Sequence, residues 1–226
     1  MGFDIKLVQQ GGGETAWPLG KIVCVGRNYA AHARELDNPV PDAPLLFIKP
    51  VTSALAIDDV LPLRFDLGNL HYETELALLI TQRISRVSAQ EGVAAIGGVG
   101  LALDLTLRDV QAVLKEKGHP WEVAKGFDGS CPFTHFIEVD GGSTDFSAYT
   151  FTLSVDGQLR QHGNTADLLF PVADLVATIS HSFTLEPGDV VLTGTPKGVG
   201  QLHPGERLQL ALNDTTLCET VISESR

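Results

Sequence analysis

The sequence has few positive charges and few cysteines. It carries 16 Lys and Arg residues against 28 Asp and Glu residues, which gives a formal net charge of −12 over 226 residues. Binding to a nucleic-acid backbone requires a clustered cationic surface, so we expect no nucleic-acid partner. The three cysteines, Cys24, Cys131 and Cys218, are far apart and form no C-x-x-C pair. They are typical of reduced thiols in a cytoplasmic protein.

Long hydrophobic runs are also missing. The longest uncharged stretch near the middle of the chain runs from Gly92 to Leu103 and is bounded by Glu91 and Asp104. A membrane-spanning helix needs about 20 apolar residues, so no membrane association is expected. The first ten residues contain no apolar core of a secretory signal. These absences favour a cytoplasmic location.

No linker, charge block or repeat divides the chain, and its length suits one domain that can bury a substantial core. Short β-rich runs and scattered helices, without regular βαβ alternation, indicate an α+β fold that is mostly β. A two-residue turn at Asp156 and Gly157 predicts a β-hairpin. The expected strands include residues 21–25, 45–48, 73–80, 190–192, 207–212 and 217–222, and the expected helices are 27–36 (ended by residues 37–39), 88–96 with a capping box, 107–117 and 171–181.

Three carboxylates are candidate metal ligands. Glu73 and Glu75 lie two apart in a predicted strand, so both side chains project from one face. Asp104 is the sole charge in an apolar run, where a carboxylate is costly unless it is paired or bound to a metal. An all-oxygen triad suits Mg²⁺ or Mn²⁺. The alternatives are a solvated strand end for the E-x-E pair, and a cap or a partner of Arg108 for Asp104.

Two further features could take part in chemistry. His32 and Glu35 lie at i and i+3 of a predicted helix, where the carboxylate can orient the imidazole as a general base. Lys125 follows an apolar stretch and could point into a site. Each also has an ordinary interpretation, a surface ion pair for the first and a solvated lysine for the second.

The turn at residues 193–200, Thr-Gly-Thr-Pro-Lys-Gly-Val-Gly, is rich in glycine. It does not match a Walker A loop, because the G-x-x-x-x-G-K-[ST] pattern is absent. It could offer backbone N–H groups and threonine hydroxyls to a carboxylate. The alternative is a plain hairpin or β-corner.

Taken together, six segments closely resemble the fumarylacetoacetate hydrolase family, in its short acylpyruvase and oxaloacetate decarboxylase branch. The segments are VCVGRNYAAHARE (23–35), LLFIKP (45–50), HYETELALLI (71–80), ALDLTLRDVQ (102–111), PWEVAKGFDGSCP (120–132) and LTGTPKGVG (192–200). The resemblance implies a mixed β-sandwich roll with peripheral short helices, assembled as a homodimer. It also implies a catalytic domain over residues 21–226, preceded by an N-terminal extension over residues 1–20.

The resemblance assigns roles to individual residues. Glu73, Glu75 and Asp104 match the family's Mg²⁺ or Mn²⁺ ligands. His32 and Glu35 match its H-x-x-E dyad on a lid over bound substrate, and Lys125 matches the lysine beside the metal. Positions that contact ligand in relatives correspond to Arg27, Tyr29, Gln111 and Thr195.

The leading functional hypothesis is an acylpyruvate hydrolase. Such an enzyme cleaves a C–C bond of a 2,4-diketo acid, such as fumarylpyruvate or acetylpyruvate, into pyruvate and a carboxylic acid. Water activated by His32 and Glu35 would attack the distal carbonyl, and Lys125 would stabilise the oxyanion. The same site could serve an oxaloacetate decarboxylase or an oxaloacetate keto–enol tautomerase, since each stabilises an enolate of a small 2-keto acid. A noncatalytic metal- or metabolite-binding module is the remaining alternative.

Overall fold

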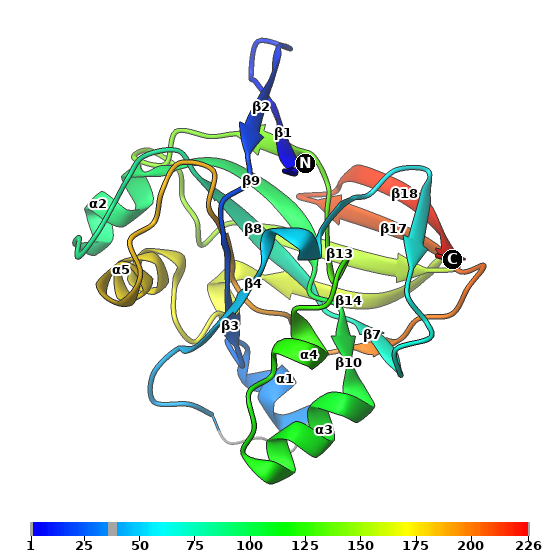
Figure 1. The fold of residues 1–226 in the computed structure, drawn as a ribbon. Coiled ribbons are helices and arrows are strands. Elements are labelled where there is room, and N and C mark those ends of the chain that lie inside the picture. Colours follow the sequence, from blue (N-terminus) through cyan, green and yellow to red (C-terminus); the bar gives the residue numbers. More distant parts are fainter. Residues whose placement is uncertain (1, 36–39, 226) are drawn as a thin grey trace.

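In the part of the chain that the structure describes, three β-sheets form most of the regular structure, and a few short helices lie around them (Figure 1). The computed structural model describes residues 2–35 and 40–225. Because strands outnumber helices among these residues, the mostly β fold predicted from the sequence is confirmed. Within the described residues, the largest sheet has ten strands, in the order β2-β1-β12-β9-β8-β15-β3-β4, with β11 pairing with β5 and β9.

The strands of the ten-stranded sheet are β1 (Asp4–Val8), β2 (Glu14–Pro18), β3 (Ile22–Gly26), β4 (Leu45–Lys49), β5 (Ala54–Ala56), β8 (Thr74–Ile80), β9 (Ile96–Leu103), β11 (Cys131–Phe133), β12 (Phe136–Glu138) and β15 (Val190–Leu192). The second sheet contains β6 (Val60–Leu63), β13 (Thr150–Val155), β14 (Gln158–Asn164), β17 (Arg207–Leu212) and β18 (Thr215–Glu224). A small third sheet contains β7 (Leu70–Tyr72), β10 (Thr106–Leu107) and β16 (Gly200–Gln201). The helices are α1 (Ala30–Glu35), α2 (Ala89–Ala94), α3 (Arg108–Lys117), α4 (Glu122–Lys125) and α5 (Val172–Ser182), with 3₁₀ turns η1 (Val51–Ser53) and η2 (Thr165–Asp167).

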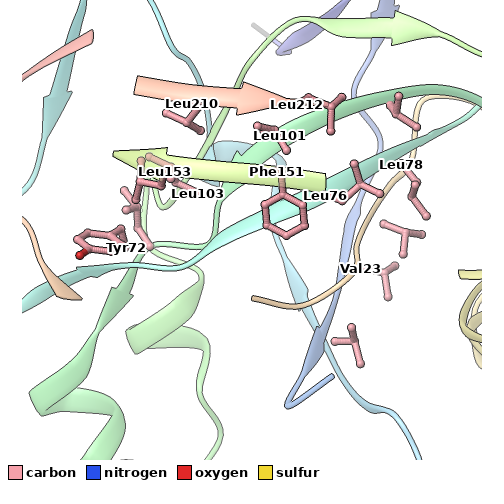
Figure 2. Packing of buried hydrophobic residues seen from close by; sticks show 14 of the residues in the cluster. Val23, Tyr72, Leu76, Leu78, Leu101, Leu103, Phe151, Leu153, Leu210 and Leu212 are labelled. Atoms are coloured by element: carbon pink, nitrogen blue, oxygen red, sulfur yellow. The ribbon is translucent and has the colours of Figure 1, made fainter. Parts of the chain in front are cut away.

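The core lies between the two larger sheets. Strand β8 is buried along its whole length, and its side chains alternate between two apolar clusters. Leu76 and Leu78 face the second sheet, where Phe151 and Leu153 of β13 pack over them (Figure 2). Ala77 belongs to the cluster on the opposite face. Strands buried on both faces explain why this segment is a continuous apolar run in the sequence.

Local signals explain several helix ends. Ser88 and Glu91 form the predicted capping box of α2, with the Ser88 N–H donating to Glu91 at 2.9 Å. Helix α3 ends at Lys117 and is capped by Gly118, whose φ of 64° is left-handed, a conformation that glycine adopts without strain. Helix α2 packs on α5 at one side of the molecule, whereas α1, α3 and α4 gather at another end (Figure 1).

Helix α1 begins later than the sequence predicts. The prediction was residues 27–36, but the helix starts at Ala30. Asn28 is held by tertiary hydrogen bonds instead: its Nδ2 donates to Thr193 O at 2.8 Å, and its Oδ1 accepts from Phe170 N at 2.7 Å. Side-chain bonds of this kind compete with the helix ladder. The predicted stop signals at residues 37–39 lie outside the described residues.

The N-terminal residues form a hairpin of β1 and β2 that joins the largest sheet through parallel pairing of β1 with β12. Ile5 and Leu7 are buried there. The division into an extension over residues 1–20 and a catalytic domain over 21–226 stays a prediction. Among the described residues, no helix is long and apolar enough to cross a membrane.

Candidate metal centre and active-site cavity

The three candidate carboxylates meet at one end of the β8–β9 ladder. In this antiparallel pair Glu75 lies opposite Ala102. Glu73 immediately precedes β8 and Asp104 immediately follows β9, so the ladder brings them together, and Asp104 N donates to Glu73 O at 2.8 Å. One carboxylate oxygen of each residue lies within 4.8 Å of the others, and all three side chains are buried. The prediction that Glu73 and Glu75 project from one face agrees with this arrangement. The strand itself begins one residue later than predicted, at Thr74.

Buried cations surround two of the three carboxylates. Lys125 Nζ lies 2.9 Å from Glu73 Oε2 and 2.6 Å from Asp104 Oδ2. Lys49 Nζ lies 2.8 Å from Asp104 Oδ1, and Arg108 pairs with Glu73. Asp104 is therefore not a partner of Arg108. Burial acts to raise the pKa of Glu73, but Lys125 and Arg108 outweigh it and hold that pKa well below its ordinary value.

Glu75 has a different environment. No cationic side chain of the described residues lies within ion-pair distance of it, and its Oε2 accepts a hydrogen bond from Gly194 N at 2.6 Å. Burial, followed by the negative charge of Asp104, raises the pKa of Glu75 well above its ordinary value. A divalent cation among the three carboxylates would remove this penalty, because it supplies the positive charge that Glu75 lacks. The all-oxygen donor set fits Mg²⁺ or Mn²⁺.

His32 and Glu35 are brought together on α1. His32 is buried, and its Nδ1 lies 3.4 Å from Glu35 Oε2. The Glu35 carboxylate also accepts hydrogen bonds from Gly198 N, at 3.0 Å to Oε1 and 3.2 Å to Oε2. Gly198 has a φ of 96°, and a Cβ there would lie 2.0 Å from Arg160 O, so glycine is required for this contact.

The turn at residues 193–200 supplies backbone donors, as the sequence suggested, and their acceptors are the protein's own carboxylates Glu75 and Glu35. Thr195 is fixed by a buried glutamine in the second sheet: Gln161 Nε2 donates to Thr195 Oγ1 at 2.8 Å, while Gln161 Oε1 accepts from Thr74 N at 2.9 Å. The turn therefore connects the metal site, the dyad and the second sheet.

A cavity opens over the carboxylates and contains most of the predicted site residues. Two predicted residues lie outside its lining: Glu35, which reaches it through His32, and Tyr29, whose buried hydroxyl has no hydrogen-bond partner among the described residues. The lining consists of Val25, Gly26, Arg27, His32, Phe47, Glu73, Glu75, Asp104, Arg108, Gln111, Lys115, Trp121, Lys125 and Thr195.

Sequence reasoning missed several residues of this site. Lys49 is fully buried at the end of β4, where it also donates to Ser130 O at 3.0 Å. The sequence contains only one indication of its role, its position at the end of an apolar strand. A lysine at such a position more often lies where the chain reaches the solvent-exposed surface. Arg108 and Lys115 were missed because cations on a short helix usually face water. Phe47 and Trp121 gave no signal beyond their apolar character.

Buried carboxylates with this donor set are typical of divalent-metal enzymes. A comparison of the whole chain with known families leads to the same class of protein. The family model described as Fumarylacetoacetate (FAA) hydrolase C-terminal matches residues 21–222. The chain belongs to the fumarylacetoacetate hydrolase family, in the short branch that the sequence resembled. It is thus a family enzyme with a buried acidic metal site.

Three similar proteins have names that state an activity. The chain is 45% identical over 206 residues to the oxaloacetate tautomerase YcgM of Escherichia coli (strain K12), covering 91% of this chain and 94% of that protein. It is 40% identical over 215 residues to a mitochondrial oxaloacetate decarboxylase of Dictyostelium discoideum, covering 93% and 98%. The crystal structure of a Pseudomonas aeruginosa fumarylpyruvate hydrolase in complex with Mn²⁺ and pyruvate matches with a TM-score of 0.89 at 32% identity, covering 98% of this chain and 97% of that one.

Proposed function

We propose that this enzyme interconverts the enol and keto forms of oxaloacetate. The main support is a cavity lined by the three carboxylates, His32 and Lys125, together with near-full-length similarity, at 45% identity, to an oxaloacetate tautomerase. The sequence alone favoured acylpyruvate hydrolysis. Tautomerisation now takes precedence because the fumarylpyruvate hydrolase is the more distant relative, at 32% identity.

The reaction moves one proton and changes no oxidation state. In the direction from enol to keto, the enol O–H bond breaks, a C–H bond forms at C3, and the double bond shifts from C2–C3 to C2–O. The enzyme must therefore stabilise negative charge on the C2 oxygen and supply a proton at C3.

His32 is the group that we assign to proton transfer at C3. Its Nδ1 faces Glu35 at 3.4 Å, which leaves Nε2 for the substrate, and the ring lines the cavity. Glu35 accepts a hydrogen bond from Gly198 N and lies beside Nδ1 of His32, so it orients the ring. Burial acts to lower the pKa of Lys125, but the negative charges of Asp104 and Glu73 outweigh it and raise that pKa. The ammonium group is therefore charged and would stabilise the enolate oxygen.

The proposed ligands of Mg²⁺ or Mn²⁺ are Glu73, Glu75 and Asp104. When bound, the ion supplies a Lewis acid that favours negative charge on the keto oxygen. Arg27, Gln111 and Thr195 line the same cavity and are assigned to substrate binding. The homodimer implied by the family resemblance stays a prediction, which light scattering on the purified protein would test.

Oxaloacetate decarboxylation is the second candidate, because the chain is 40% identical to an oxaloacetate decarboxylase over nearly its whole length. Loss of CO₂ leaves the same kind of enolate, on pyruvate. This reaction needs stabilised charge on the C2 oxygen, but no proton transfer before the C–C bond breaks.

The test follows three reactions with one enzyme preparation and Mg²⁺ or Mn²⁺. Freshly dissolved enol-oxaloacetate is monitored by its ultraviolet absorbance, pyruvate from decarboxylation by a coupled lactate dehydrogenase assay, and acylpyruvate cleavage by loss of the diketo absorbance. We expect ketonisation to be accelerated most. Cleavage of acetylpyruvate or fumarylpyruvate without acceleration of ketonisation would contradict the proposal and restore the hydrolase hypothesis.

A further inference from the structure

One buried amide group connects the second sheet to two parts of the carboxylate site. Gln161 lies in β14 and is fully buried. Its Oε1 accepts from Thr74 N at 2.9 Å, and its Nε2 donates to Thr195 Oγ1 at 2.8 Å and to Pro196 O at 3.0 Å. Thr74 separates the two glutamates of the triad, whereas Thr195 lines the cavity. Both ends of the amide therefore bond to segments that form the site.

The two backbone partners determine which end of the amide is the donor. A peptide N–H can only donate and a carbonyl oxygen can only accept. The side-chain oxygen of Gln161 must therefore face Thr74 N, and its nitrogen must face Pro196 O. The second N–H of the same nitrogen then points to Thr195 Oγ1. In this contact the hydroxyl of Thr195 is the acceptor, so its own proton is directed elsewhere.

The proton of the Thr195 hydroxyl has no acceptor among the described residues, although the hydroxyl oxygen accepts from Gln161. Two residues earlier, the hydroxyl of Thr193 donates to Leu76 O at 3.0 Å, so that group is fully used inside the protein. Thr195 is 3% exposed and lines the cavity. A buried hydroxyl that donates to nothing costs free energy, which an acceptor in the cavity would remove.

We infer that Gln161 is a positioning residue, which acts by fixing the Thr195 hydroxyl as a hydrogen-bond donor to a carboxylate or enolate oxygen of the bound ligand. This inference rests on the proposed function, in which an anionic 2-keto acid occupies the cavity. Without the amide, the hydroxyl can rotate and turn its lone pairs toward the anion. The amide therefore orients the donor before the ligand arrives, which lowers the cost of binding.

Oxalate tests the inference without turnover, because it is an unreactive dianion with the adjacent oxygen atoms of a 2-keto acid enolate. Its affinity is measured by calorimetry on protein saturated with Mn²⁺. Thr195→Val removes the hydroxyl at nearly constant size and should weaken oxalate binding about tenfold or more, the scale of one hydrogen bond to a charged group. Gln161→Met should weaken it about fivefold or more, because the hydroxyl stays but loses its fixed direction.

The double-mutant cycle isolates the effect of the hydroxyl. If Gln161 acts through Thr195, adding Gln161→Met to Thr195→Val should change the oxalate affinity by less than about twofold. An equal loss with and without the hydroxyl would show that Gln161 acts on the fold in general, and it would overturn the inference. Unchanged oxalate affinity in Thr195→Val, or no oxalate binding by the wild type, would overturn it as well.

Two controls separate this role from a merely structural one. Thr195→Ser keeps a hydroxyl, so it should retain the oxalate affinity within about threefold, together with the sensitivity to Gln161→Met. Thr165→Val removes another buried hydroxyl close to β14, which accepts from Tyr149 N at 3.0 Å and lies outside the cavity. It should leave the oxalate affinity within about twofold. A loss in Thr165→Val as large as in Gln161→Met would overturn the inference.

Failure of the proposed function has a different result. Coupling between Gln161 and Thr195 in oxalate binding, without ketonisation of oxaloacetate by the wild type, would support the oriented hydroxyl and contradict the tautomerase. Ketonisation by the wild type without this coupling would overturn the inference alone.

Discussion

Lys49 Nζ lies 2.8 Å from Asp104 Oδ1, and both side chains are buried. The ammonium group also donates to Ser130 O and to Lys125 O, so it connects a metal-ligand candidate to the segment that carries the second buried lysine. A buried ion pair contributes little net free energy while both partners are present, but the loss of one partner leaves an uncompensated charge. Lys49 is therefore a positioning residue for the carboxylate site.

Replacing Lys49 with methionine should destabilise the metal-free protein by about 3–5 kcal/mol, the usual cost of breaking a buried ion pair. Urea denaturation measures this change. A divalent ion supplies positive charge beside Asp104, so saturating Mn²⁺ should recover part of the loss. Lys6→Met is the control, because Lys6 pairs with Glu14 on the surface at 2.8 Å and should cost about 1 kcal/mol or less. Equal losses in the two variants would contradict the role given to Lys49.

Gly198→Ala tests the connection between the 193–200 turn and the dyad. A Cβ at this position would lie 2.0 Å from Arg160 O, so the turn must shift and Glu35 loses its backbone donor. We expect kcat/KM for ketonisation to fall about tenfold or more, the scale of one hydrogen bond to a charged group. Circular dichroism and urea denaturation check the fold of the variant.

Gly205→Ala is the matched control for that change. Gly205 also has a positive φ, of 91°, but nothing lies within 4 Å of its Cβ position. Backbone strain should cost each alanine variant about 1 kcal/mol of stability, and the contact with Arg160 O should add to the loss in Gly198→Ala. Only Gly198→Ala should lose activity. If both variants keep wild-type kinetics, the backbone donor is not needed to position Glu35.

Much of the fold could be predicted because local signals agreed with the tertiary structure. The hairpin of β13 and β14 turns at Asp156 and Gly157, both with positive φ, as an Asp-Gly turn requires. The exception at α1 has a tertiary cause. Residues 27–29 carry a helix-compatible sequence, but Asn28 bonds to segments more than 140 residues away, which no local pattern encodes.

The carboxylates were predictable for a similar reason, and the cations were not. Glu73 and Glu75 are related by strand periodicity, and Asp104 is conspicuous in an apolar run. Lys49 reaches the site from β4 because β3, β15, β8 and β9 are neighbours in the sheet, an order that the sequence does not state. Which cations enter a cavity depends on that order and on the packing of α3.

The cysteines should be nearly unreactive in the native protein. Cys24 and Cys131 are buried, and burial raises the pKa of both thiols. Burial also raises the pKa of Cys218 to about 11, so its reactive thiolate is a fraction on the order of 10⁻³ at pH 8. Labelling with a thiol-specific disulfide reagent at pH 8 should be slow at Cys218 and absent at the other two, whereas all three should react in denaturant. Rapid labelling of Cys24 or Cys131 in the native state would contradict the buried positions.

His32→Ala and Asp104→Asn together separate proton transfer from charge stabilisation. Ketonisation needs a proton delivered at C3, so loss of the imidazole should lower its kcat/KM by about 10²–10⁴-fold. Decarboxylation needs mainly stabilised charge on the C2 oxygen, so His32→Ala should reduce it far less. Asp104→Asn weakens the carboxylate triad and should reduce both reactions, together with Mn²⁺ affinity measured by electron paramagnetic resonance. The measurement is kcat/KM of both variants for both reactions under saturating Mg²⁺. If His32→Ala lowers the two by the same factor, His32 acts on a step that both reactions share, and its assignment to proton transfer at C3 is wrong.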